Sequence, residues 1–160
     1  MKRFLMAALL MAPLLGAPLS GFAGDIAPRE GWVVKDTAKP YATLLEDLRA
    51  AIRDNKMGLV TEAGPTEAAR KRGVEIPGNR VLGVYRNDFA VRALEASRAG
   101  MIEAPIRFYV TENPDGTATL SYKTPGFVFA PYADEGGAAL AAVASELDAI
   151  FAAIAAQAVQ

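Results

Sequence analysis

The 160-residue sequence contains no cysteine and no histidine. Without cysteine the protein has no disulfide bond, no thiol nucleophile and no thiolate ligand for zinc, copper or haem iron. Without histidine, Ser-His-Asp triads and the usual imidazole metal sites are excluded as well. Carboxylates could still hold a hard cation, but no segment has the acidic spacing of a calcium-binding loop. We therefore expect no metal ion and no cofactor, and a fold stabilised by core packing alone.

The N-terminal segment has the three parts of a cleavable signal peptide. Lys2 and Arg3 give it a positive start, and the apolar run over 4–15 that follows is too short to span a bilayer as a helix. The segment ends in Gly21-Phe22-Ala23, which places small residues at both recognition positions of a signal peptidase site. We predict a signal peptide over 1–23 that is cleaved between Ala23 and Gly24. The mature protein would be periplasmic or secreted and would have no stable membrane anchor.

The mature chain has an ordinary charge and the length of one domain. Removal of the leader leaves fifteen cations against eighteen acids, which gives no basic surface for nucleic acid. The remaining residues, about 137, are enough for one self-sufficient core. We expect a flexible lead-in over 24–30 and a single globular domain over 31–160, since no linker, repeat or charge run divides the chain.

Hydrophobic periodicity and turn signals predict alternating strands and helices. Strands are expected over 32–35, 57–61, 80–85, 106–112 and 118–123, with a further short strand over 127–129. Helices are expected from Pro40 to a closing Asn55, over 66–71, over 88–98 with Asn87 as its cap, and over 138–156. The Asn113-Pro114-Asp115-Gly116 turn should join two of the strands as a hairpin. This order predicts an α+β fold with one mostly antiparallel sheet, helices on one face and a long C-terminal helix.

Several segments together resemble the family known as domain of unknown function 302. They are the run from Gly73 to Asn87, the run from Glu103 to Val110, the Asp115-Gly116 turn and the segment Ser121 to Pro125. The resemblance covers about residues 32–132. It implies a TATA-binding-protein-like β-α-β4-α topology, but it implies no established activity and supplies no catalytic residues. Many members have Asn-Pro after the central strand, where this chain has Asn87-Asp88.

Strand alternation indicates one candidate ligand-binding surface. If Ile106, Phe108 and Val110 face the helices, neighbouring side chains on these two strands face the other way. The candidate binding residues on that open face are Arg107, Tyr109, Ser121 and Lys123. Two cations beside hydroxyl groups could bind a carboxylate or a phosphate. The alternative is a solvated sheet face that carries only cross-strand pairs.

The sequence leaves three functions open. The first is a non-enzymatic domain that binds a small anionic or amphipathic ligand, or a protein partner. The second is a hydrolase or isomerase that uses Lys123, Tyr109 or carboxylates, for which catalytic residues are otherwise unknown. The third is a structural homodimer in which the same sheet face is the interface.

Overall fold

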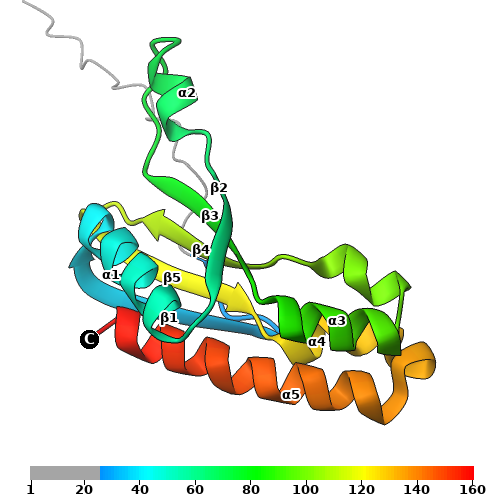
Figure 1. Cartoon of the computed structure of the whole chain (residues 1–160). Coiled ribbons are helices and arrows are strands. Elements are labelled where there is room, and N and C mark those ends of the chain that lie inside the picture. Colours follow the sequence, from blue (N-terminus) through cyan, green and yellow to red (C-terminus); the bar gives the residue numbers. More distant parts are fainter. Residues whose placement is uncertain (1–25) are drawn as a thin grey trace, which may run out of the picture.

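The computed structural model describes residues 26–160 (Figure 1). The predicted signal peptide, its cleavage site and the start of the lead-in lie outside the described residues.

The described chain contains five strands and five α-helices. The strands are β1 (Trp32–Pro40), β2 (Gly58–Ala63), β3 (Asn79–Tyr85), β4 (Ile106–Glu112) and β5 (Thr117–Lys123). The helices are α1 (Tyr41–Asp54), α2 (Thr66–Arg70), α3 (Asn87–Ala96), α4 (Pro125–Phe129) and α5 (Ala133–Ala158). Two short 3₁₀ helices, η1 (Ala99–Glu103) and η2 (Ala130–Tyr132), complete the order.

The five strands form one antiparallel sheet in the order β1-β5-β4-β3-β2. The predicted hairpin joins β4 to β5, and β1, the first strand in sequence, returns to the edge beside β5. Helices α1, α3 and α5 pack together with the sheet, and α5 contacts both α1 and α3 (Figure 1). The predicted α+β class and the long C-terminal helix are therefore confirmed.

The core lies between the sheet and the helices, and the alternation of β4 places its apolar side chains there. Phe108 is fully buried, and its ring stacks on that of Phe151 from α5 at 4.6 Å between centroids. Tyr122 of β5 meets Phe108 edge to face at 5.1 Å. Aromatic contacts of this kind add to the free energy gained by burial alone. They join the two central strands to the closing helix.

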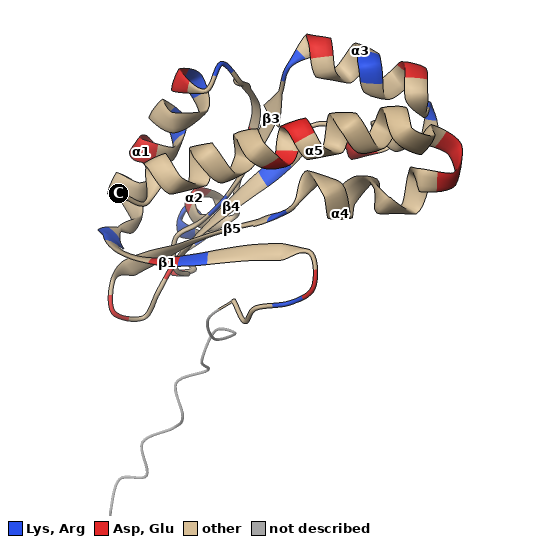
Figure 2. Cartoon of the chain, turned by 90° about the horizontal axis from the view of Figure 1, so that it is seen from below, with Lys and Arg blue, Asp and Glu red and all other residues tan. Residues whose placement is uncertain are grey.

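Helix α5 is long and rich in alanine, and its charged positions are few (Figure 2). By length and composition the segment Pro125–Ala158 is the one candidate for a membrane span among residues 26–160, with a mean hydropathy of 1.8 over its most apolar window. Its buried side chains include Leu140, Leu147 and Ile154, which belong to the core. The apolar side of the helix thus packs against the domain. The helix begins earlier than predicted, with a kink at Gly137, where φ is 51°.

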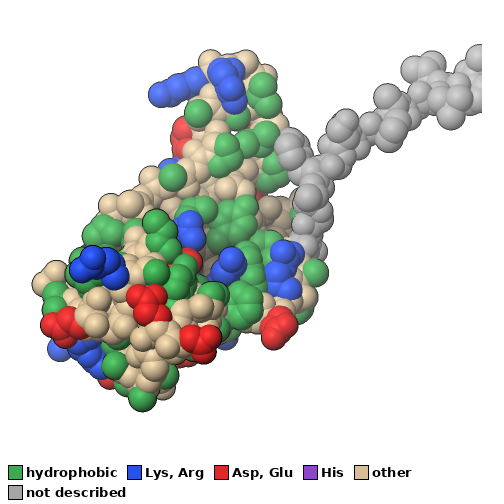
Figure 3. Space-filling model, turned by 90° about the vertical axis from the view of Figure 1, so that its right-hand side faces the viewer, with side chains coloured by type: hydrophobic (Ala, Val, Ile, Leu, Met, Phe, Trp, Pro, Cys, Tyr) green, Lys and Arg blue, Asp and Glu red, His purple; other side chains and the backbone are tan. Residues whose placement is uncertain are grey.

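Strands β2 and β3 continue into an arm that carries α2 at its tip, away from the rest of the domain (Figure 1). The cations Arg70, Lys71 and Arg72 follow there, and all three are exposed. Figure 3 shows cationic side chains at the tip of this arm.

The predicted strand over 127–129 is wrong, because this segment belongs to helix α4. Thr124 caps the helix, since its hydroxyl oxygen accepts a hydrogen bond from the Phe127 backbone N–H at 3.3 Å. The carboxylate of Asp148 accepts a second one from the Gly126 N–H at 3.0 Å. Pro125 occupies the first turn, where a missing N–H costs nothing. A capping residue followed by proline outweighed the strand propensity of the two phenylalanines and the valine.

Two predicted boundaries also differ. Strand β1 continues to Pro40, beyond the expected end at residue 35, because its partner β5 pairs with it as far as Thr37 and again, after a bulge, at Pro40. Asn87 is the first residue of α3 rather than its cap; the N-cap is Arg86, which makes no side-chain cap hydrogen bond.

Candidate functional site

Three of the four predicted ligand-binding residues line one cleft at an end of the sheet. Arg107 stands near the start of β4 and Lys123 at the end of β5, and Lys123 is the register partner of Trp32, the first residue of β1. The cleft has a volume of about 350 Å³. We call it the sheet-end cleft, and its lining residues are Trp32, Asn79, Val81, Glu103, Ile106, Arg107, Tyr109, Tyr122, Lys123 and Val128.

The cations of the cleft are exposed and lack an acidic partner. Within residues 26–160, neither Arg107 nor Lys123 forms an ion pair or a side-chain hydrogen bond. The Lys123 ammonium lies 5.8 Å from the centroid of the Trp32 ring, and the Arg29 guanidinium lies 5.0 Å from it. Both distances suit cation–π attraction. Two positive charges therefore lie close to the indole ring.

Tyr109 is held in place by a neighbouring strand. Its hydroxyl oxygen accepts a hydrogen bond from the side-chain amide of Asn79, and its backbone is paired with Val81 of β3. Both of these β3 residues line the cleft as well. One wall of the cleft therefore consists of the Tyr109 ring, the Asn79 amide and the Val81 side chain, whose positions are set by the pairing of β3 with β4.

One acid also lines the cleft. Glu103, at the end of η1, accepts a hydrogen bond from the Tyr132 hydroxyl at 2.8 Å. This hydrogen bond to Glu103, together with burial, raises the pKa of Tyr132 above its ordinary value of 10.0. The Tyr132 hydroxyl is a neutral donor, so this hydrogen bond does not neutralise the negative charge of the Glu103 carboxylate. The cations Arg107 and Lys123 still outnumber the single carboxylate among the lining residues.

Ser121 does not lie in the cleft. It is opposite Tyr109 in the register, on the same side of the sheet, but its side chain is fully buried. Its hydroxyl has no hydrogen-bond partner among the described residues. Thr119, two residues earlier on that side, is buried too, and its hydroxyl donates to the Asp36 carboxylate at 2.8 Å. This part of the sheet face is not the open, solvated surface expected from alternation.

Four residues of the cleft were not among the predicted site residues: Trp32, Glu103, Asn79 and Val128. Trp32 could have been included only if the pairing of β1 with β5 were known, because ninety-one positions separate it from Lys123. The other three come from η1, β3 and α4, and no spacing in the sequence connects these elements.

The arrangement suits binding more than covalent chemistry. A catalytic lysine normally needs a desolvated environment, whereas the Lys123 side chain is exposed to solvent. Among residues 26–160 no group of three or more acidic side chains could hold a metal ion. What the cleft presents is fixed aromatic surface next to two cations, and these are the elements of a site for an anion with an apolar part.

Comparison with known proteins agrees with this fold. The family model described as "Domain of unknown function DUF302" matches residues 33–154. No curated protein matches the chain. A crystal structure of an uncharacterized conserved DUF302 protein from Bacillus stearothermophilus superposes with a TM-score of 0.71 at 18% identity, covering 81% of this chain and 99% of that one. At this identity the likeness supports the fold alone. Because the family model spans most of its length, the chain belongs to the DUF302 family.

Proposed function

We propose that this domain binds a small amphipathic anion in the sheet-end cleft, without catalysing a reaction on it. The observation that carries the proposal is the pair of cations, Arg107 and Lys123, which have no acidic partner among residues 26–160 and stand beside the indole ring of Trp32. An anionic group would bind between the cations. The apolar part of the same ligand would lie on the ring.

The size and walls of the cleft fit such a ligand. Its volume of about 350 Å³ falls at the small end of ligand sites, which are mostly apolar and carry a few well-placed polar groups. Val81, Ile106 and Val128 supply the aliphatic surface. Figure 3 shows one face of the domain on which cationic side chains stand among hydrophobic ones. A ligand of this size is closer to a metabolite than to a protein segment.

We further propose that the ligand is met outside the cytoplasm. This part of the proposal is supported by the sequence of residues 1–23, with its basic start, apolar run and small residues before Gly24. Cell fractionation of the full-length protein, followed by N-terminal sequencing of the exported form, tests it. We expect Gly24 as the first residue; retention of Met1 in a cytoplasmic fraction would refute export.

Trp32 makes ligand binding directly measurable, because it is the chain's single tryptophan and lines the cleft. We would titrate phenylacetate, its uncharged isostere phenylacetamide, and acetate, following Trp32 fluorescence and heat by calorimetry. Phenylacetate should bind most tightly, because it alone offers both a carboxylate and an aromatic ring. The R107Q/K123Q double variant should weaken phenylacetate binding by about tenfold to a hundredfold, as expected for lost charge-assisted hydrogen bonds.

The matched control is R53Q/K71Q, which removes two exposed cations that lie outside the cleft. It changes the net charge equally and should leave phenylacetate binding as in the wild-type protein. Equal binding of phenylacetate and phenylacetamide, or equal losses in both double variants, would refute a specific anion site. Light scattering on the same samples tests the alternative of a structural homodimer, which would give twice the monomer mass at micromolar concentration.

A further inference from the structure

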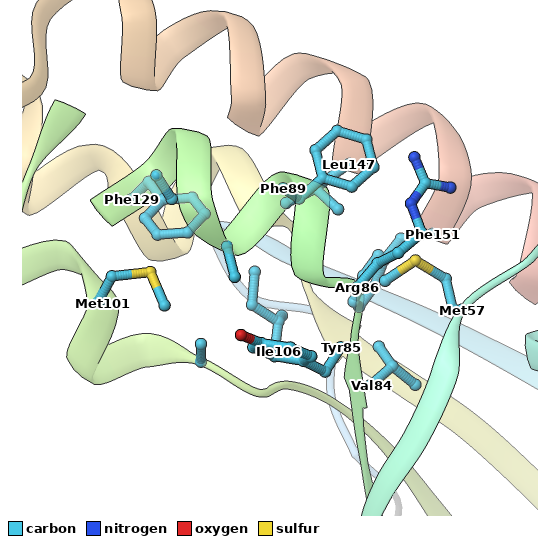
Figure 4. Close-up of a pocket in the computed structure, with 13 residues that line it drawn as sticks. Met57, Val84, Tyr85, Arg86, Phe89, Met101, Ile106, Phe129, Leu147 and Phe151 are labelled. Carbon is cyan, nitrogen blue, oxygen red and sulfur yellow. The ribbon is translucent and has the colours of Figure 1, made fainter. Parts of the chain in front are cut away.

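A second cavity, partly open to the surface, lies between the sheet and the helices, and we call it the interior cavity (Figure 4). It has a volume of about 30 Å³, more than a single water molecule needs. Figure 4 shows Met101 on one side of it and the side chains of Phe89 and Leu147 on the other. The lining is mostly apolar, and the exceptions are Tyr85 and Arg86, of which Arg86 pairs with Asp88. An apolar space of this kind favours hydrocarbon over water.

This interior cavity and the sheet-end cleft are separated by a thin wall. Ile106 lines both spaces. Two pairs of adjacent residues are divided between the two spaces. Glu103 lines the cleft and Ala104 lines the cavity. In α4, Val128 lines the cleft and Phe129 lines the cavity. Residues at the end of η1, at the start of β4 and in α4 therefore contribute to the wall.

The wall lies at the end of the sheet where strand β4 begins with Ile106. Ala104 and Pro105, which precede Ile106, are not part of a strand. Ile106 points toward the helices, and Arg107, the next residue, points to the open face. A ligand whose anionic group is bound by Arg107 therefore lies next to Ile106, the residue that lines both the cleft and the interior cavity.

We propose that the ligand is an alkyl carboxylate, or a similar anion with a flexible hydrocarbon tail, and that the end of its tail occupies the interior cavity behind Ile106. This inference rests on the proposed anion site and assigns Ile106 as the residue that determines specificity for tail length. Met57 and Met101 line the cavity, and their unbranched side chains adapt to an incoming group at little cost. The small volume admits only the end of the tail.

The first test is a series of straight-chain carboxylates from butanoate to decanoate, each below its micelle concentration. In the wild-type protein the affinity should rise about fourfold per methylene group over part of the series and then level off once the cavity is filled. A93L places a larger side chain in the cavity from α3. It should leave butanoate binding unchanged and abolish the gain for longer chains.

The second test does not depend on a core substitution. Met57 and Met101 are the only methionines after the predicted leader, and both line the interior cavity. With ¹³C-methyl-labelled methionine, the mature protein should give two resonances. Octanoate should shift both of them, whereas butanoate should shift neither.

The outcomes separate this inference from the proposed function. If A93L keeps the same chain-length dependence, or if octanoate binds without shifting the methionine resonances, the tail lies elsewhere and the inference is overturned while the anion site stands. If no carboxylate of any length binds in a manner that depends on Arg107 and Lys123, the proposed function itself is wrong. I106A supports the inference if it tightens octanoate binding more than butanoate binding, and it opposes the inference if both change equally.

Discussion

The ring of Phe127 in α4 lies directly over the backbone of Gly31. A Cβ atom at Gly31 would stand 2.0 Å from Phe127 Cγ, far inside any contact distance, and the φ angle of Gly31 is 72°. The Gly31 carbonyl also accepts a hydrogen bond from the Thr124 backbone N–H at 2.9 Å. The segment that leads into β1 is therefore fixed to α4 beside the sheet-end cleft, and only glycine permits this approach.

We predict that G31A lowers the free energy of unfolding by about 2–4 kcal/mol, because it adds a steric clash to backbone strain. Urea denaturation of the mature protein would measure this loss. The control is G116A in the β4–β5 turn, where φ is 83° but no atom lies within 4 Å of the added Cβ. G116A should cost about 1–2 kcal/mol from strain alone. Equal losses in the two variants would show that Phe127 does not press on Gly31.

For Ser121 we predict that removal of the hydroxyl is harmless. The side chain is fully buried and its oxygen has no partner among the described residues, so it bears a desolvation cost without a compensating bond. S121A should leave the free energy of unfolding unchanged or raise it by about 1–2 kcal/mol. Phenylacetate affinity should also be unchanged, since Ser121 does not line the cleft. A clear loss of affinity would restore Ser121 to the ligand site.

Phe151 should be the most costly single truncation in α5. It is fully buried and stacks on Phe108, so F151A should destabilise the protein by about 3–5 kcal/mol. Denaturant titrations followed by circular dichroism would measure the change. A153S, at an exposed position of the same helix, is the control and should shift stability by less than about 0.5 kcal/mol. A small effect of F151A would mean that the helix does not close the core as described.

The ion pair between Arg92 of α3 and Glu146 of α5, with an N–O distance of 2.6 Å, predicts a pH dependence. The hydrogen bond from Arg92 lowers the pKa of Glu146 below its ordinary value of 4.5. A carboxyl group whose pKa is depressed in the folded state contributes stability above its unfolded pKa and loses it as the pH falls through the folded value.

Wild type and E146Q should therefore differ in free energy of unfolding by a constant amount well above pH 4.5. The difference should shrink below that pH and vanish once the pH has fallen through the lowered pKa of Glu146. The effect should be small, because both side chains are about half exposed, and 1 M salt should reduce it further. Chemical denaturation at a series of pH values provides the measurement. If the free energies of unfolding of wild type and E146Q still differed at low pH, the charge on Glu146 would not be the cause.

Much of the fold follows from local pattern. The alternation of Ile106, Phe108 and Val110 predicted which face of β4 is buried, and the Asn113-to-Gly116 turn predicted the hairpin. Both signals depend on near neighbours in the chain, where spacing fixes geometry. The segment 127–129 shows the limit: its residues suit a strand, but the Thr124 cap and the distant Asp148 carboxylate stabilise a helix.

The candidate site could be predicted only in part. Alternation placed Arg107 and Tyr109 on one side of β4 and Lys123 on the same side of β5, and the structure finds all three in one cleft. The same rule placed Ser121 with them, yet the packing around this central-strand residue buries it. The alternation of side chains along a strand shows on which face of the sheet a residue lies, but it does not show whether neighbouring side chains cover that residue.

The α+β class, the family and the absence of cysteine- or histidine-based chemistry follow from composition and local periodicity, which need no knowledge of distant contacts. The position of Trp32 beside Lys123, the contribution of Glu103 and Val128 to the cleft, and the place of Ile106 between the cleft and the interior cavity are visible only in the folded domain. They depend on strand order and helix docking, which join segments far apart in the chain. A binding site made at the end of a sheet exists only where those segments meet.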